Sequence, residues 1–423
     1  MRLQWSEIKF FDRRMSLSKF TRETLESAQQ VQIVDRLDDL VMYCYDADSD
    51  LDQADHLIRQ SRGLVFHGEE LLVKTFPYTP MYLGVTHGIY LRHFEKVTVD
   101  GGKPAFQILP KTEFNYLQAN WGKLIFYPAQ EGTLIRAFAV NGKWYFATHR
   151  RLDANRCFWG GKISFGELFA FALKKLFNSE KTNEEILSEL SSHLDQSKVY
   201  VFLLKPTIQT RIVSFPDEKE PVILVGVFEN NVFQKDFESI PGIPSVKQLT
   251  GFRDIFDLYK RVEGMAPEYY QGVLIMTPKG ECIKICSYQY LHRYLLRGNV
   301  DSIKLRYLQI LSHPHLIECF RQMYPEKEAD FDEYEDIIDG IAQTLADHYN
   351  RRYGTERKEY VILESVEHHF LVGVRATYNY SNIDPAVMRE YLIRDMKVSD
   401  LNKMIHDDLH LRRDIEKIID ADD

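Results

Sequence analysis

The chain has 423 residues, with 53 lysines and arginines against 62 aspartates and glutamates, and a formal net charge of -9. Apolar residues make up 44% and charged residues 27%, a mixture typical of globular proteins that excludes a disordered or fibrous one. No apolar run approaches the roughly 18 residues of a membrane span, and the start lacks the apolar core of a secretion signal. Five scattered cysteines fit a reducing compartment, so we expect a cytoplasmic protein that is neither secreted nor inserted in a membrane.

Charge is distributed unevenly along the chain. Residues 301–423 contain 16 lysines and arginines and 26 aspartates and glutamates, a net charge of -10, so residues 1–300 carry only +1. Such a step indicates a domain boundary. We therefore expect a helical or partly ordered lead-in over residues 1–40, one domain over residues 41–300, and an acidic helical domain over residues 301–423.

Residues 40–300 contain short runs of β-branched and aromatic residues between glycine and proline signals, which predict strands. Asn141-Gly142 between two such runs is a strong signal for a two-residue hairpin. Few runs alternate one for one with helical segments, so an antiparallel α+β domain is expected. The predicted strands are Leu64–Phe66, Leu71–Thr75, Gly132–Val140, Lys143–Thr148, Val199–Leu204, Arg211–Phe215, Val222–Phe228, Val273–Met276 and Cys282–Cys286.

Helices are predicted inside this region and throughout the part that follows it. Capping boxes at Ser164 and Thr182 open the first two helices, and a third is expected over Ser245–Val262. After residue 300 the apolar residues recur with a period of 3.6 and the outer faces are acidic, which predicts an all-helical domain and offers a surface for a protein partner. Its expected helices are Ile303–Leu311, Phe331–Tyr349, Asp384–Asp395 and Val398–Ile419.

The common nucleotide and metal signatures are absent. The chain has neither a P-loop nor a dinucleotide-binding glycine motif. The histidine pairs His313/His315 and His368/His369 lack a second ligand group at metal spacing, so solvated or hydrogen-bonded histidines are the better interpretation. Cys282 and Cys286 fall on one face of a predicted strand and are interpreted as buried small side chains. No metal site is predicted.

An ordered set of segments nevertheless runs through the chain. The most specific are an arginine–glycine strand at Ser61–Phe66, a hairpin at Gly142–Thr148 and a Lys-x-x-Ser-x-x-Tyr-Leu-His run at Lys284–His292. In order and spacing, residues 60–298 resemble the RNA ligase family of covalent nucleotidyltransferases, especially the bacteriophage tRNA-repair type. The acidic helical tail is similar to the C-terminal domain of that family. The resemblance implies a nucleotidyltransferase fold.

The resemblance also implies a lysine nucleophile, two catalytic glutamates and a pair of lysines over the phosphates, and this chain departs from that pattern. The nucleophile position holds Ala129, and a methyl group cannot attack phosphorus. The two glutamate positions hold Leu203 and Gln271. Of the two phosphate-binding lysines, Lys284 is present and Cys286 replaces the other. No catalytic residue is therefore expected, and the carboxylates that would hold a metal are missing together with the nucleophile.

Part of a surface for nucleic acid is retained in the sequence. The resemblance implies that nucleotide or phosphate contacts would come from Arg62, Glu131, Gly132, Thr133 and Lys284. Candidate contacts to RNA are Arg150, Arg151, His292 and Arg293. The opposing interpretation is that these are ordinary surface cations, because a net charge of +1 over 300 residues supplies little attraction for a polyanion.

We therefore expect an RNA ligase-like homologue that has lost self-adenylylation and has a binding or structural role. One alternative is an active ATP-dependent RNA ligase, using ATP and Mg²⁺, in which Lys111 or Lys123 serves as a displaced nucleophile. A second alternative is an enzyme that seals only RNA that is already adenylylated. Apolar filling of the space around Ala129, Leu203, Gln271 and Lys284 would count against both.

Overall fold

The computed structural model describes residues 20–46, 51, 55–84, 107–208, 210–278, 280–298, 300–355 and 361–422. Contacts between residues divide these into two compact units. The first unit contains the described residues up to 291, and the second contains those from 292 onward. Within the described residues, no helix combines the length and the apolar character needed to span a bilayer.

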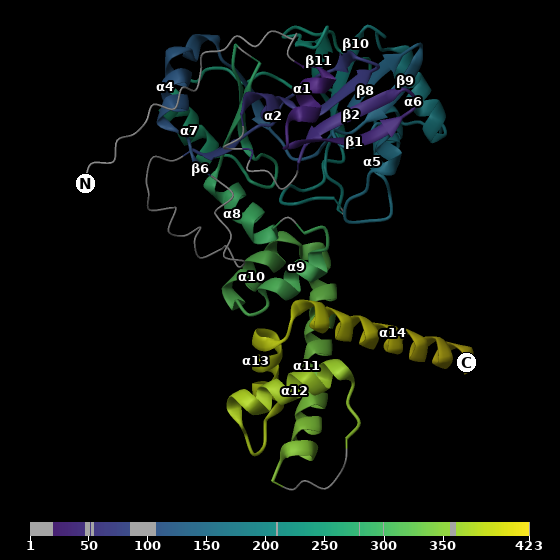
Figure 1. Cartoon of the computed structure of the whole chain (residues 1–423), viewed down its shortest axis with the longest axis vertical. Helices are drawn as coiled ribbons and strands as arrows, with labels where there is room; N and C mark the ends of the chain where they lie inside the picture. The colour runs from purple at the N-terminus through teal and green to yellow at the C-terminus, as the bar shows by residue number, and fades with distance from the viewer. Residues whose placement is uncertain are drawn as a thin grey trace, which may run out of the picture. The chain divides into compact units, whose positions relative to one another are not determined.

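A four-stranded antiparallel sheet forms the beginning of the first unit (Figure 1). Its strands, in spatial and sequence order, are β1 (Val31–Leu37), β2 (Leu40–Tyr45), β3 (Arg62–His67) and β4 (Glu70–Val73). The short helices α1 (Arg22–Ser27) and α2 (His56–Gln60) precede β1 and β3 in the chain. Strand β1 corrects the expectation of a helical or partly ordered lead-in, because Val31 and the residues after it pair along the buried strand β2.

A second sheet of five strands packs against the first. One of its faces, with Phe138, Val199 and Val201, meets Met42 and Val65 of the first sheet. Its other face, with Phe202 and Leu204, is covered by α5 and α6 (Figure 1). The strand order is β12 (Val232–Phe233), β11 (Val222–Glu229), β10 (Lys198–Leu204), β8 (Thr133–Val140) and β9 (Lys143–Ala147), and the helices are α5 (Phe165–Phe177) and α6 (Asn183–Ser192).

A third sheet is assembled from strands that lie far apart in the sequence. Its central strands β13 and β14 form an antiparallel pair, whereas β5 joins β14 in parallel. Helices α4 and α7 supply apolar side chains to the same core as β13 and β14. The order is β6 (Gln107–Ile108), β5 (Met81–Leu83), β14 (Cys282–Cys286), β13 (Gly272–Met276) and β7 (Ile125–Ala129), with α4 (Lys111–Ala119) and α7 (Ile255–Glu263).

Two predicted elements of this unit are wrong. Arg211–Phe215 is not a strand, because its backbone N–H groups donate to a buried carboxylate and not to a neighbouring strand. The helix expected over Ser245–Val262 exists only as α7. The segment before α7 is extended, and Ser245 and Leu249 form isolated bridges to Leu224 and Phe126.

The second unit is helical throughout its described residues. Its long helices bury one apolar face each, such as Ile337, Ile341 and Leu345 of α11, as the period of 3.6 predicts. The helices are α8 (Tyr288–Arg297), which begins in the first unit, α9 (Ile303–Ile310), α10 (Pro314–Met323), α11 (Glu328–Tyr353), α12 (Ser365–Tyr378), α13 (Pro385–Asp395) and α14 (Val398–Asp422). Short 3₁₀ turns lie at Trp121–Lys123, Ala154–Arg156 and Pro325–Lys327. The expected α+β class with a helical C-terminal region is confirmed.

Candidate functional site

The third sheet brings three of the four altered motif positions together. Gly272, next to Gln271, pairs with Ala129 of β7 on one side and with Cys286 of β14 on the other. The Gln271 N–H donates to the Ala129 carbonyl at 2.8 Å. Ala129 is 4% exposed, so its methyl group is buried. The positions that the sequence aligned with a nucleophile, a glutamate and a lysine are therefore neighbours on three adjacent strands.

A continuous chain of hydrogen bonds runs beside these positions. The Lys284 ammonium donates to Gln271 Oε1, and Gln271 Nε2 lies 2.8 Å from the Tyr290 hydroxyl. That hydroxyl donates in turn to Glu131 Oε2 at 3.4 Å. We call Lys284, Gln271, Tyr290 and Glu131 the polar chain. Tyr290 is fully buried and Gln271 and Glu131 nearly so, which means that side chains of this protein already satisfy one another here.

Glu131 anchors the far end of the polar chain to the backbone. Its carboxylate accepts N–H groups from Ile212 at 2.5 Å, Val213 at 2.9 Å and Ser214 at 3.1 Å. Burial raises the pKa of the Glu131 carboxyl, and these three donors offset part of that rise. Glu131 was predicted to contact a nucleotide or phosphate, but its oxygens are turned toward the chain's own backbone. These contacts connect Glu131 to the segment 212–214, and its contact with a nucleotide stays a prediction.

Gly132 and Leu203 meet where β8 begins. Gly132 has φ +154, and a Cβ atom there would lie 2.4 Å from the Leu204 carbonyl oxygen and 2.9 Å from the Leu203 side chain. Only glycine fits so close an approach. Thr133 is the first residue of β8 and pairs with Leu204. Leu203 is 7% exposed, so an apolar side chain fills the position that the resemblance assigns to a glutamate.

A group of cations lies around Arg62, at the start of β3. Burial lowers the pKa of Lys284, of Arg136 and of His149, and the Arg62 guanidinium lowers each of them further, which places its charge near all three. Arg150 lies with its guanidinium carbon 5.5 Å from the centre of the Tyr45 ring and also depresses the pKa of His149. We call Arg62, Arg136, Arg150 and Lys284 the cation group.

Tight backbone packing holds this group in place. Arg136 is 2% exposed and donates to the carbonyls of Gly63 and Thr148, which ties β3 to the end of β9. Gly63 has φ +67, and a Cβ atom there would lie 2.8 Å from the His149 Cα. The glycine that follows Arg62 is therefore required for the two sheets to approach each other.

The cation group forms no ion pair among the described residues, although the Glu131 carboxylate at the far end of the polar chain is near enough to act electrostatically on Lys284. No aspartate or glutamate in the described ranges forms an ion pair with Arg62, Arg136, Arg150 or Lys284. The Nε atoms of Arg62 and Arg136 are both buried without a hydrogen-bond partner. Burial lowers the pKa of Arg136 to about 10 and also lowers that of Lys284. Because buried charges are costly unless they are paired, this arrangement suits an anionic ligand.

Burial also explains the state of His149 and of the two cysteines. Burial first, and then the nearby arginines, keep the pKa of His149 well below its ordinary value, so the ring is neutral at pH 7. Burial raises the pKa of Cys282 and of Cys286 to about 12. Both cysteines are therefore protonated, small apolar side chains, in line with their interpretation from sequence. In the described part of the chain, no three histidine, cysteine or acidic side chains converge to hold a metal ion.

The remaining predicted RNA contacts are distributed elsewhere. Arg151 donates to the Val34 carbonyl at 2.8 Å and lies 3.9 Å from the Asp35 carboxylate, so it is held against β1. His292 and Arg293 are on α8 and belong to the second unit. Of the four candidates, only Arg150 joins the cation group.

The two lysines that could act as displaced nucleophiles are both exposed and lie outside the polar chain. Lys111 is the first residue of α4. Lys123 ends the 3₁₀ turn that precedes β7, whereas Ala129 ends that strand. The intervening strand separates Lys123 from Ala129 by roughly 15 Å or more, at about 3.3 Å per residue. Neither lysine is hydrogen-bonded to a member of the polar chain.

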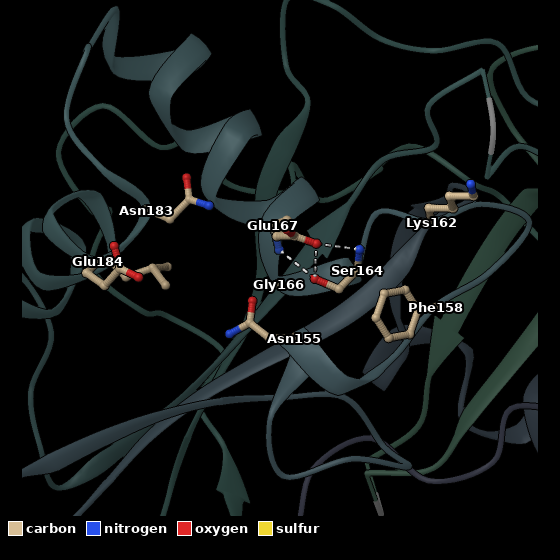
Figure 2. A pocket seen from close by; sticks show the side chains of 9 residues that line it. Asn155, Phe158, Lys162, Ser164, Gly166, Glu167, Asn183 and Glu184 are labelled. Atoms are coloured by element: carbon tan, nitrogen blue, oxygen red, sulfur yellow. Dashed lines mark hydrogen bonds between the residues drawn. The ribbon is translucent and has the colours of Figure 1, made fainter.

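A separate pocket of about 530 Å³ lies at the first turns of α5 and α6 (Figure 2). Figure 2 shows Glu167 bound to Ser164 in the capping box of α5, with Glu184 at the opposite wall. No motif position lines this pocket. Its two glutamates outnumber its one cation, Lys162, so it is unsuited to phosphate.

The chain is similar in sequence to viral immediate-early proteins, although no protein-family model matches it. It is 31% identical over 225 residues to the immediate-early protein ICP-46 homolog of Invertebrate iridescent virus 3, covering 52% of this chain and 48% of that protein. It is 28% identical over 328 residues to the homolog of Invertebrate iridescent virus 6, covering 75% of this chain and 67% of the relative. The chain thus spans about half the length of the first of these relatives.

Two solved structures show a distant likeness. One is a chain from Aquifex aeolicus provisionally assigned as an ATP-dependent DNA ligase, with 13% identity and a TM-score of 0.34 over 84% of this chain and 86% of that one. The other is an archaeal ATP-dependent RNA ligase, with 11% identity and a TM-score of 0.33 over 90% of this chain and 77% of that one. At these TM-scores the likeness supports no conclusion about fold or activity.

Proposed function

We propose that this chain is an RNA ligase-like nucleotidyltransferase homologue that binds RNA or a nucleotide through phosphate groups and does not adenylylate itself. The observation that carries the proposal is the polar chain beside Ala129. A buried methyl group occupies the position of the nucleophile. Gln271 and Tyr290 are hydrogen-bonded to each other at a place where a ligase would need side chains available to the substrate. The site retains positive charge but lacks a reacting atom.

The residues present do not fit a catalytic Mg²⁺ ion. Magnesium prefers carboxylate and water oxygens in octahedral geometry. The two motif positions that would supply carboxylates hold Leu203 and Gln271, and the Glu131 carboxylate beside them accepts three backbone N–H groups. We therefore assign no step to a metal.

Phosphate binding is supported by the cation group. Arginine suits this role because its guanidinium donates several hydrogen bonds to phosphate oxygens and stays charged. The Arg62 and Arg136 Nε atoms have no hydrogen-bond partner in the described part of the chain, and Lys284 lies near Arg62. Such contacts are independent of base sequence, so we propose a ligand recognised by its phosphates.

Incubation with α-labelled ATP and Mg²⁺, followed by denaturing electrophoresis, tests the loss of self-adenylylation. We expect no covalently labelled protein from the full chain. A labelled band would contradict the proposal and favour an active ATP-dependent RNA ligase. A parallel incubation with adenylylated RNA and an acceptor strand tests the sealing-only alternative, and no joined product is expected.

One observation favours a second candidate, in which Lys284 is itself the displaced nucleophile. Burial lowers the pKa of its ammonium group, which raises the fraction of neutral amine available to attack. The amine would attack the ATP α-phosphorus, forming a P–N bond, releasing pyrophosphate and giving up a proton. Under this candidate Lys284→Ala abolishes the labelled band, whereas Lys123→Ala, the matched exposed control, leaves it unchanged.

A further inference from the structure

Two histidines on the last helix of the chain face each other. His406 and His410 are four residues apart on α14, so they occupy the same side of the helix. Both are exposed, whereas Leu401 and Ile405 of the same helix are buried. The two imidazole rings lie 4.4 Å apart between centroids, closer than the rings of His313/His315 at 6.4 Å or His368/His369 at 5.7 Å.

The two Nε2 atoms are 3.2 Å apart. Two imidazole nitrogens bound to one tetrahedral zinc ion, each at 2.0–2.1 Å, are separated by about 3.3 Å. The side chains therefore present two nitrogen ligands at the separation that a single ion requires. A helix with histidines four residues apart is a recurrent way to present two ligands to a metal.

Asp407 supplies a further feature of such a site. Its carboxylate oxygen lies 3.7 Å from His406 Nδ1, on the opposite side of the ring from His410. At this distance the carboxylate is not hydrogen-bonded to the ring, but its negative charge favours a cation bound by the two histidines.

We infer that His406 and His410 form a two-histidine site for a divalent transition-metal ion that prefers imidazole, the class that includes Zn²⁺ and Cu²⁺. No third histidine, cysteine or acidic side chain completes the site within the described ranges, so water takes the remaining coordination positions. This inference concerns the second unit and does not depend on the proposed function.

Calorimetric titration of the full, chelator-treated chain with Zn²⁺ tests the site. We expect one equivalent of Zn²⁺ to bind and to be removed again by chelator. His406→Ala and His410→Ala should each abolish that equivalent, and the double variant should lose no more than either single one, because both nitrogens must bind the same ion. His368→Ala and His369→Ala, a matched pair on α12 whose rings do not converge, should retain it.

Because His406 and His410 are exposed, their alanine variants should keep the wild-type circular dichroism spectrum and melting temperature. Retention of the full zinc equivalent by a folded His406→Ala or His410→Ala variant would overturn the inference. So would an equal loss in the His368→Ala and His369→Ala controls, which would place the bound ion elsewhere.

Discussion

The arginines of the cation group, in the sheet-rich unit, have surroundings opposite to those of several arginines in the helical unit. In the helical unit, Arg321 contacts Glu328 and Asp332, Arg389 contacts Glu335 and Asp339, and Arg394 contacts Asp395. In the sheet-rich unit, Arg62, Arg136 and Arg150 form no ion pair with any carboxylate of the described residues. The same side chain is therefore neutralised at these positions of the helical unit and left with unmet charge in the cation group, although other arginines of the sheet-rich unit, such as Arg156 beside Asp35, are paired.

This difference changes what the net charges mean. The helical part is acidic, and several of its arginines are already paired with carboxylates, so it offers no attraction for a polyanion. The first 300 residues carry only +1 overall, yet that figure conceals four clustered cations. The local arrangement of charged side chains, more than the net charge, decides whether a phosphate can be bound.

The contrast between paired arginines and the cation group would fail if Glu131 served as the counter-ion of that group. We expect it to be an acceptor for backbone N–H groups instead, so Glu131→Ala should lower the free energy of unfolding by about 3 kcal/mol, since it leaves three buried donors unsatisfied. Denaturant unfolding of the full chain measures this. Glu131→Gln, which keeps one acceptor oxygen, should lose less, and exposed Glu184→Ala should stay within about 0.5 kcal/mol of wild type. Equal losses from Glu131→Ala and Glu131→Gln would indicate that the charge is what matters.

Measurements of RNA binding test directly whether Arg62 of the cation group contacts phosphate. Arg62→Ala should weaken the binding of a short single-stranded RNA by about tenfold, since one charge-assisted contact to phosphate is lost. It should also reduce the slope of log K against log salt by about 1. Fluorescence anisotropy at several salt concentrations measures both.

Arg321→Ala is the matched control for that experiment, because Arg321 is already paired with Glu328 and Asp332. Its RNA affinity should equal that of the wild type. If the two variants lose affinity equally, the distinction between the units has no bearing on binding.

The smallest effect concerns pH. Because the pKa of folded Lys284 is below the ordinary 10.5, the folded state releases its proton before the unfolded state does as pH rises. The unfolded state then binds more protons, so this group makes the protein more stable as pH approaches 10.5 from below. Relative to Lys284→Met, wild type should gain stability over that interval, because burial lowers the pKa of the folded Lys284 ammonium. A stability difference that is constant with pH would show that Lys284 titrates normally.

Strand positions were predictable where short β-branched runs end at glycine or proline, as at Lys198–Leu204 and Cys282–Cys286. The extended segment at residues 211–215 misled this reasoning. Its strand-like composition reflects burial, but its N–H groups bind Glu131, some 80 residues earlier in the chain. No local pattern encodes so distant an acceptor.

The candidate site was predictable only in part. The order of segments placed Ala129, Gln271 and Cys286 in one site, and the structure brings them onto adjacent strands. Tyr290 is the tyrosine of the Lys284–His292 run, but its burial between Gln271 and Glu131 was not predicted. The pairing of His406 with His410 was missed, although their spacing of four on a predicted helix was a visible signal.

The connectivity of the sheets dictates the sequence of folding events. The four strands of the first sheet are consecutive in the chain, so their contacts close short loops and can form while synthesis continues. The third sheet pairs Met81–Leu83 with Cys282–Cys286, about 200 residues later. Lys284 therefore cannot join Arg62 until most of the chain has left the ribosome. A nascent chain shorter than about 290 residues would display the cationic strand β3 without the sheet that completes its surroundings.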